Sequence, residues 1–294
     1  MGILQHALRL TGANLRSPFL RTALPSLATA YAIQAAVAVP SIRAKTEHYY
    51  DASGSVTFLA VTLVSLGLRG GGWGWRHIAL SAAAVVWSLR LGSYLYTRIA
   101  ASDGRDSRFD GIRAHPAKFA AAFAAQATWV SLVLMPVVAV NAVPAVGLRA
   151  TDVLGGAVFL AGFACEVVAD RQKSAWLDGK KRKLHDEEFM TSGLWSRSQF
   201  PNYFGEITLW TGIATVAAGA LVSPAAQAAL GVSGVGGKLL ALGLSYVSPA
   251  FTAFLLLKVS GVPLSEKKYD DRYGDREDYR EWKRNTPKLF PKLF

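Results

Sequence analysis

The residues best suited to chemistry lie at the start of one helical pattern in the C-terminal third of the chain. A glycine-containing turn leads through Pro201 into this pattern, and Arg197 lies just before it. Asn202, Glu206 and Trp210 are four residues apart, so they share one helix face. Proline and polar groups in a first turn are typical of a helix start that donates N–H groups to an anion. This spacing favours a phosphate-bearing ligand.

A second polar set lies on an earlier helical segment. Glu166, Asp170 and Lys173 are spaced i, i+4 and i+7, and therefore share a face at the end of an apolar run. Two acids that enter a membrane span are costly without partners, which favours a functional site. The alternative is a solvated helix end with an internal ion pair.

A third candidate surrounds an arginine inside an apolar run. Trp87, Arg90 and Tyr94 fall on one helix face. An intramembrane arginine usually faces a cavity or a partner. Two interpretations remain open: Arg90 extends to the membrane interface from near a helix end, or it forms the wall of a buried polar pocket.

The elements that must position these residues are transmembrane helices. Of the 294 residues, 51% are hydrophobic and only 18% are charged, and the mean hydropathy is +0.25. Soluble domains carry about 25% charged residues. The apolar runs are long enough to cross the roughly 30 Å hydrocarbon layer as helices and lack strand alternation. We expect an all-α, multi-pass membrane helix bundle of about seven transmembrane helices, near 22–40, 54–68, 77–96, 117–140, 152–169, 203–222 and 239–257.

The basic residues predict an orientation for this bundle. With seven spans, 24 of the 32 Lys and Arg residues fall on one side and seven on the other, with Arg90 inside a span. Cytoplasmic loops carry the excess of Lys and Arg. We therefore expect a cytoplasmic, amphipathic C-terminal tail, in the endoplasmic reticulum membrane of a eukaryote or the inner membrane of a bacterium. The net charge of +12 follows this sidedness, so we expect the lipid bilayer and not nucleic acid as the partner.

Metal and disulfide chemistry receive no support from the cysteine content. The single cysteine, Cys165, lies in an apolar span, where packing is its expected role. We expect no metal site.

The order of several motifs resembles the steroid 5-alpha-reductase superfamily, and more closely its branch of uncharacterised multi-pass membrane proteins. The most specific piece is the GLW…PNYFGE signature at 193–206, which Trp210 and Gly212 follow. The other matching pieces are Tyr49-Tyr50-Asp51-x-Ser53-Gly54-Ser55, Trp87-x-x-Arg90-Leu91-Gly92, Gly104-Arg105-Asp106-x-Arg108-Phe109-Asp110, Glu166-x-x-x-Asp170-x-Gln172-Lys173, Ser260-Gly261-Val262-Pro263-Leu264-x-Glu266 and Arg272-Tyr273-Gly274.

The resemblance implies a membrane-embedded oxidoreductase of lipid metabolism that binds NADPH and adds a hydride to an activated C=C bond. The implied substrate is a hydrophobic steroid, isoprenoid or lipid enone. The implied division of the chain is a tail at 1–21, four helices within 22–150, and a cofactor-binding domain at 151–294. The implied cofactor-binding residues are Glu166, Asp170, Lys173, Arg197, Asn202, Glu206, Trp210, Glu266, Tyr273 and Tyr279.

The chain departs from the family pattern at three places. Gln199-Phe200 replaces the usual Arg-His before Pro-Asn-Tyr, Trp282 occupies a slot that usually holds tyrosine, and Trp87 occupies the slot of the substrate-protonating tyrosine.

Hydride addition to an enone places negative charge on the carbonyl oxygen, which must meet a proton donor in a dry site. Tyr94, Tyr203 and a protonated Glu206 are the candidates for this donor.

Two other classes of protein remain open. One is a methyltransferase that uses S-adenosylmethionine and resembles the isoprenylcysteine carboxyl methyltransferases. The other is a non-catalytic membrane protein that retains the fold.

Overall fold

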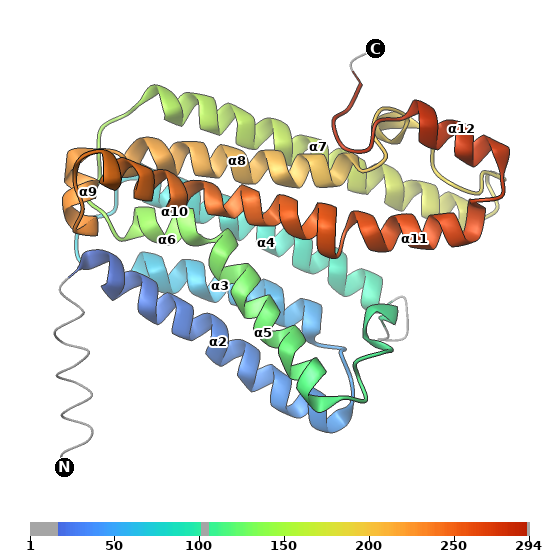
Figure 1. Ribbon diagram of the computed structural model, residues 1–294, viewed down its shortest axis with the longest axis horizontal. Helices are drawn as coiled ribbons and strands as arrows, with labels where there is room; N and C mark the ends of the chain where they lie inside the picture. The colour runs from blue at the N-terminus through green and yellow to red at the C-terminus, as the bar shows by residue number, and fades with distance from the viewer. Residues whose placement is uncertain (1–16, 101–105, 293–294) are drawn as a thin grey trace. The chain divides into compact units, whose positions relative to one another are not determined.

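All regular elements of the protein are helices. The computed structural model describes residues 17–100 and 106–292, without the side chains of 96–100 and 107, and no strand occurs within those residues (Figure 1). The expected all-α class is confirmed. Most of the predicted N-terminal tail, and Gly104 and Arg105 of the loop motif, lie outside the described residues.

Within the described residues, five helices are long and apolar enough to cross a membrane, which makes the chain an integral multi-pass membrane protein. They are α2 (Pro18–Ala44), α4 (Trp75–Ala100, of which Trp75–Leu95 qualifies), α7 (Ala150–Lys181), α8 (Pro201–Leu221) and α10 (Gly234–Phe254), which continues through a π-helical turn, η3 (Leu255–Val259), into α11 (Val262–Tyr273). A sixth candidate is the pair α5 (Pro116–Val133) and α6 (Met135–Asn141), which is bent by 53°.

The count therefore falls below the expected seven because of α3 (Tyr50–Gly67). This 18-residue helix corresponds to the predicted span 54–68 but is not among the qualifying helices. It carries buried hydroxyl side chains along its length, at Ser53, Thr57, Thr62 and Ser65. These groups bond within the protein: Thr57 accepts a hydrogen bond from the buried Gln34 amide at 2.8 Å.

The chain forms two compact units. The first contains the residues up to Arg149 together with Ala217–Ser248, and the second contains Ala150–Val216 together with Pro249–Phe294. The boundaries fall before α7, inside α8 and inside α10. The division at 150–151 that the resemblance implies stays a prediction.

The first unit packs α2, α3, α4 and the bent α5–α6 pair around aromatic side chains. Figure 1 shows α5 crossing α2 obliquely. Phe58, Trp87 and Trp129 meet edge to face, with the Phe58 ring 5.1 Å from Trp87 and 4.9 Å from Trp129. Such contacts add to the burial of large aromatic area.

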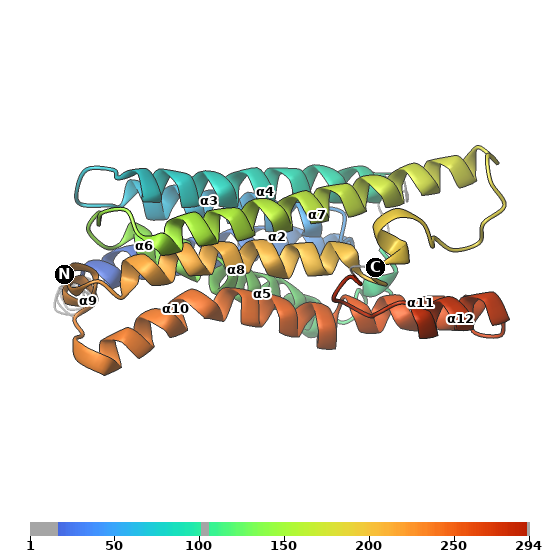
Figure 2. The ribbon, with the colours of Figure 1, turned by 90° about the horizontal axis from the view of Figure 1, so that it is seen from above.

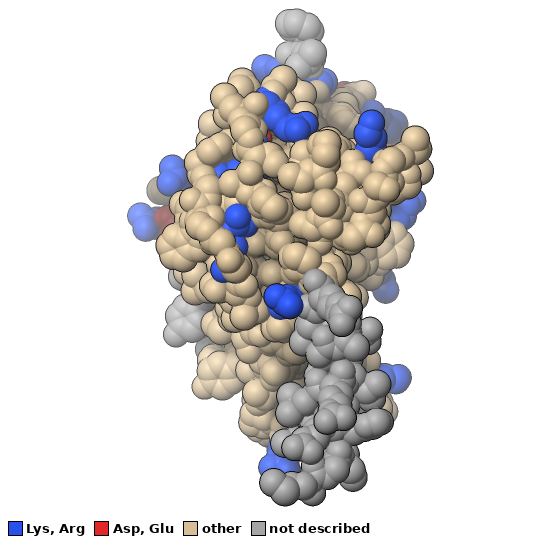
Figure 3. Space-filling view, turned by 90° about the vertical axis from the view of Figure 1, so that its left-hand side faces the viewer, with Lys and Arg blue, Asp and Glu red and all other residues tan. Residues whose placement is uncertain are grey.

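The helix α9 (Pro224–Leu230) lies at one end of this unit. At the same end, two arginines bond to the loop that follows α6. Arg76 donates to the carbonyls of Val146 at 3.0 Å and Gly147 at 3.1 Å, and Arg69 donates to the carbonyl of Val143. Viewed from this end, the surface shows Lys and Arg and scarcely any Asp or Glu (Figure 3).

The second unit is organised on α7 and α8, which lie side by side in both ribbon views (Figure 2). At 1.5 Å per residue the 32 residues of α7 extend about 48 Å, more than the roughly 30 Å hydrocarbon layer. The helix α7 is therefore longer than one membrane crossing requires. The 3₁₀ turn η2 (Gly193–Ser196) packs against α7 through Trp195, whose indole donates to the carbonyl of Ala169 at 3.1 Å. The helices α11 and α12 (Glu277–Asn285) complete the unit.

Candidate functional site

The predicted site centres on the first turns of α8. Pro201 begins the helix, as the sequence predicts. The Oδ1 atom of Asn202 is buried and has no hydrogen-bond partner among the residues that the structure describes. The ring of Tyr203 stacks on Phe200 with centroids 5.4 Å apart and planes 5° apart. A buried, unsatisfied carbonyl oxygen is uncommon in proteins, and a ligand N–H group would satisfy it.

The acidic face of α7 meets this part of α8. Glu166 is 2% exposed, and Gly205 of α8 packs directly on its backbone. A Cβ atom on Gly205 would lie 2.5 Å from the Glu166 nitrogen. Glu166 and the helix turn that carries Glu206 are therefore neighbours. Asp170 lies one turn further along α7 and is half-buried.

Lys173 lies where α7 meets η2 and α11. Its Nζ lies 4.4 Å from the centre of the Trp195 ring and 6.0 Å from that of Tyr269. Gln172, beside it, accepts a hydrogen bond from the backbone N–H of Leu194 at 2.9 Å. Cation–π contacts of this kind attract an ammonium group to the faces of aromatic rings.

An aromatic cluster contains the two predicted tyrosines of the tail. Tyr273 and Tyr279 pack with Phe189 and Trp282, and Tyr269 lies against them. The Tyr273 hydroxyl donates to the carbonyl of Glu188 at 2.8 Å.

The Tyr279 hydroxyl in the same cluster donates to Asp270 at 2.8 Å. Burial and this carboxylate raise the pKa of Tyr279. Trp282, in the slot where the family usually has tyrosine, donates its indole N–H to the carbonyl of Trp195 at 3.2 Å. Both aromatic residues therefore hold the tail to the loop before α8.

The remaining predicted residues are spread over the two units. Glu266 forms ion pairs with Lys288 at 2.9 Å and Lys283 at 3.7 Å. Trp210 is fully buried on α8, whereas Arg197 is exposed. Tyr94 belongs to the first unit, on α4 with the half-buried Arg90.

A cavity of about 520 Å³ lies beside the aromatic cluster. Its lining includes Phe189 and Trp282 and five carboxylates, at Asp186, Glu187, Glu188, Asp278 and Glu281. None of the predicted site residues lines it. Its acidic character makes it a poor phosphate site, so we place the candidate site at the start of α8.

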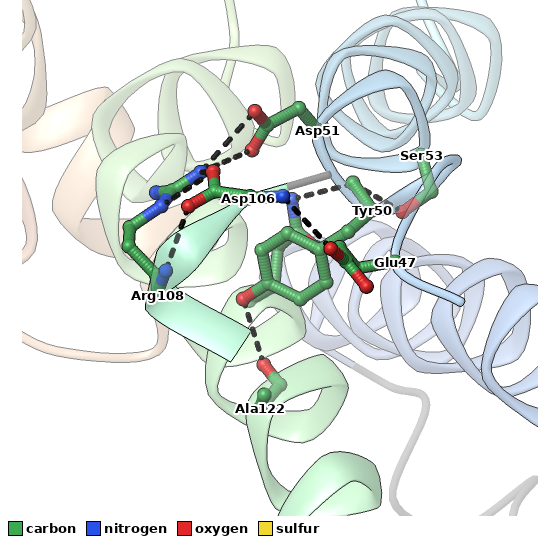
Figure 4. A network of polar contacts seen from close by, with 8 residues as sticks. Glu47, Tyr50, Asp51, Ser53, Asp106, Arg108 and Ala122 are labelled. Atoms are coloured by element: carbon green, nitrogen blue, oxygen red, sulfur yellow. Dashed lines mark hydrogen bonds and ion pairs between the residues drawn. The ribbon is translucent and has the colours of Figure 1, made fainter. Parts of the chain in front are cut away.

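A separate polar network in the first unit joins two of the family motifs. Arg108 bonds to Asp51 at 3.1 Å and to Asp106 at 2.6 Å, while the Tyr50 hydroxyl donates to the carbonyl of Ala122 (Figure 4). Glu47 accepts hydrogen bonds from the N–H of Asp106 at 2.8 Å and from Arg113.

Burial acts to raise the pKa of Glu47, but the Arg113 and Asp106 donors outweigh it and lower the pKa below 4.5. The partners of these carboxylates are thus basic side chains and backbone groups of the chain itself. Sequence reasoning identified the motifs but not Glu47 or Arg113.

Sequence reasoning also missed the polar residues that hold the loop before α8. Ser198 and Gln199 are buried, and both bond to the C-terminal segment. Both residues lie inside the GLW…PNYFGE signature, which is the signal that could have identified them. Of the two, only Gln199 is identified from the sequence, as a departure from the family pattern.

The helices define a multi-pass helical membrane protein, and the start of α8 is its candidate site. The model of a family described as "Protein of unknown function (DUF1295)" matches residues 38–286, and the chain belongs to this family. No curated protein and no solved structure shows a match to the chain.

Proposed function

We propose that the protein is a membrane-embedded, NADPH-dependent reductase of the steroid 5-alpha-reductase type. It adds a hydride to an activated C=C bond of a hydrophobic enone. The observation that carries this proposal is the buried Oδ1 of Asn202, which lacks a partner among the described residues. Burying such an oxygen without a hydrogen bond costs about 1–3 kcal/mol, so a bound ligand that donates to it would be favoured.

The nicotinamide end of NADPH suits this position chemically. Its carboxamide carries both a donor and an acceptor, and can bond to an amide and a carboxyl group together. Asn202 and Glu206 are one turn apart on α8 and offer that pair. The reduced nicotinamide supplies the hydride, and the protein orients the reacting groups and excludes water.

The phosphates require cations near the same helix start. Lys283 and Lys288 are engaged by Asp270 and Glu266. Arg197 is exposed, lies four residues before Pro201 and donates to the carbonyl of Lys292 at 3.4 Å; we assign the phosphate contact to its guanidinium because of its place before α8. Lys173, held between Trp195 and Tyr269, is the second cation that we assign to this role.

The proton that completes the reduction must come from a group of this chain. Tyr203 and Glu206 lie within the first two turns of α8, next to the proposed nicotinamide position. Tyr94 remains the candidate from the first unit. A donor of this kind stabilises the charge that develops on the carbonyl oxygen.

The test is direct binding of NADPH to purified protein in nanodiscs. Glu206→Leu should remove most of the binding, while Glu206→Gln, which can still form hydrogen bonds, should retain part of it. Thr211→Val is the matched control, because the Thr211 hydroxyl donates within α8, to the carbonyl of Ile207 at 2.8 Å. Each variant should keep the thermal stability of the wild type within a few degrees.

Three outcomes would contradict the proposal. Binding by Glu206→Leu as tight as that of the wild type would make Glu206 a structural residue. Binding of S-adenosylmethionine in place of NADPH would favour the methyltransferase class. Binding of neither by a folded wild-type protein would favour a non-catalytic protein.

A further inference from the structure

The C-terminal end of the chain is bonded along the loop that precedes α8. We call residues 283–292 the C-terminal strap. The backbone N–H of Lys292 donates to the carbonyl of Arg197 at 3.0 Å. The backbone N–H of Gln199 donates to the carbonyl of Pro287 at 2.9 Å. The Ser198 hydroxyl donates to the carbonyl of Leu289 at 2.8 Å. Three consecutive loop residues thus hold the strap much as a neighbouring strand would.

The Gln199 side chain makes two hydrogen bonds to the strap. It is 7% exposed, and its Nε2 donates to the carbonyl of Lys283 at 3.0 Å and to that of Thr286 at 2.6 Å. An amide nitrogen has two N–H groups, so these two bonds use its full donor capacity. Any replacement that cannot donate leaves two carbonyl groups of the strap facing a group that offers no hydrogen.

The strap also reaches α8 and α11. The Phe290 ring packs edge to face on Phe204, in the first turn of α8, with centroids 5.7 Å apart. At the other side, Lys283 pairs with Asp270 at 2.7 Å and Lys288 with Glu266 at 2.9 Å. The strap therefore connects α11 to the helix turn that carries Asn202.

We propose that Gln199 is a positioning residue that docks the C-terminal strap and thereby fixes the first turn of α8 for the nicotinamide. This inference rests on the proposed function. Gln199 lies three residues before Asn202, and the peptide bonds between them lead directly into the helix. The residue that departs from the usual Arg-His pair thus serves to hold the strap.

The experiment compares three side chains of similar volume at position 199 in the full chain. Gln donates two hydrogen bonds, Gln199→Met donates none, and Gln199→Glu presents acceptor oxygens to two carbonyl groups. If donor capacity matters, strap release and the NADPH Kd should both increase in the order Gln, Met, Glu. If only side-chain volume matters, the three proteins should behave alike.

Strap docking can be measured without any ligand. Trypsin cleavage after Lys288 frees the peptide 289–294, or 289–292 after a second cut at Lys292, and mass spectrometry can follow both products over time. We expect release to be at least tenfold faster in Gln199→Glu, and the NADPH Kd to be at least tenfold higher. The melting temperature without NADPH should change little, because the strap lies at one end of α8.

Gln172→Glu is the matched control. Gln172 uses its Oε1 atom to accept the N–H of Leu194, and a glutamate keeps that acceptor. The same amide-to-acid change should therefore leave strap release at its wild-type rate, because the Gln172 bond is to Leu194, outside the strap. If Gln199→Glu cannot be purified, a chain that ends at Lys288 replaces it. This chain keeps the Gln199 bonds, loses the bonds to Leu289 and Lys292, and should raise the Kd less than tenfold.

The outcomes separate this inference from the proposed function. If Gln199→Glu leaves the strap docked, Gln199 does not hold it and the inference is wrong. If the strap is released but NADPH binds as before, the strap does not position α8, although the reductase proposal stands. If wild-type protein binds no NADPH, the reductase proposal and the positioning role both fail, whereas the protease result still decides the docking role.

Discussion

At the scale of single residues, Glu47 illustrates how one buried carboxylate can join segments far apart in the chain. It is 3% exposed and bonds to Arg113 through both oxygens, as well as to the backbone N–H of Asp106. Removing one partner of such a pair leaves the other charge poorly solvated. The loop that contains Arg113 should therefore depend on Glu47 more than on any exposed acid.

Glu47→Gln should lower the free energy of unfolding by roughly 1–3 kcal/mol, because a charge-assisted pair is replaced by weaker neutral hydrogen bonds. Thermal unfolding in detergent at pH 7 measures this effect. Asp110→Asn is the matched control, since the Asp110 side chain is 67% exposed and lies 3.3 Å from the same Arg113. It should cost at most about 0.5 kcal/mol. Equal losses in the two variants would contradict the assigned role of Glu47.

The Glu47 pair also has a defined pH dependence. Its pKa in the folded protein lies below the ordinary 4.5, so its stabilisation is fully present above about pH 4.5. The stabilisation is lost as the pH falls through the lower, folded-state value. The difference in melting temperature between wild type and Glu47→Gln should accordingly shrink at pH 4 and below. A difference that stays constant down to pH 3 would show that the ionised carboxylate is not responsible.

At the scale of elements, glycines set the distance between α7 and α8. Gly155 and Gly162 on α7 face Gly212 and Gly205 on α8, and each glycine touches the backbone of the opposite helix. Close backbone approach through small residues is typical of helix pairs in membranes. The same approach brings Glu166 next to the start of α8, so the geometry of the candidate site depends on it.

Gly155→Ala should destabilise the protein by roughly 1–3 kcal/mol through overpacking. A Cβ atom there would lie 2.6 Å from the Gly212 carbonyl oxygen and 2.8 Å from the Val216 nitrogen, and neither backbone atom can move without shifting α8. Gly156→Ala is the control, because no atom lies within 4 Å of its Cβ position. Thermal unfolding should show a loss for the first and no loss for the second, since alanine favours the helix. A reversed order would contradict the close packing.

At the scale of the whole molecule, the basic residues predict which ends of the helices face the cytoplasm. Cysteine variants at Ser174 and Ser265 should resist labelling by a membrane-impermeant maleimide in intact cells, because both segments are predicted to be cytoplasmic. Ser233, in the loop before α10 and on the predicted opposite side, should be labelled. Cys165 is replaced in all three proteins to remove background. Strong labelling at Ser174 or Ser265 would reverse the predicted orientation.

Much of the architecture follows from composition and periodicity alone. Apolar runs of membrane length require helices, since backbone groups in lipid must bond within the same segment. The start of α8 at Pro201 and the shared face of Asn202 and Glu206 follow from local rules of helix geometry. These features depend on residues close together in sequence, which is why the sequence determines them.

Tertiary structure decided the rest, because it depends on contacts between residues far apart in the chain. The bonds from Gln199 to residues 283–287 span more than 80 positions, and the Glu47–Arg113 pair spans 66. No local pattern distinguishes a buried amide that holds a strap from one that binds a ligand. The hydroxyl groups of α3 are a further example, since Thr57 bonds to Gln34 of α2 and Ser65 to Asn141 of α6, and the neighbours of a helix are set only when the chain folds.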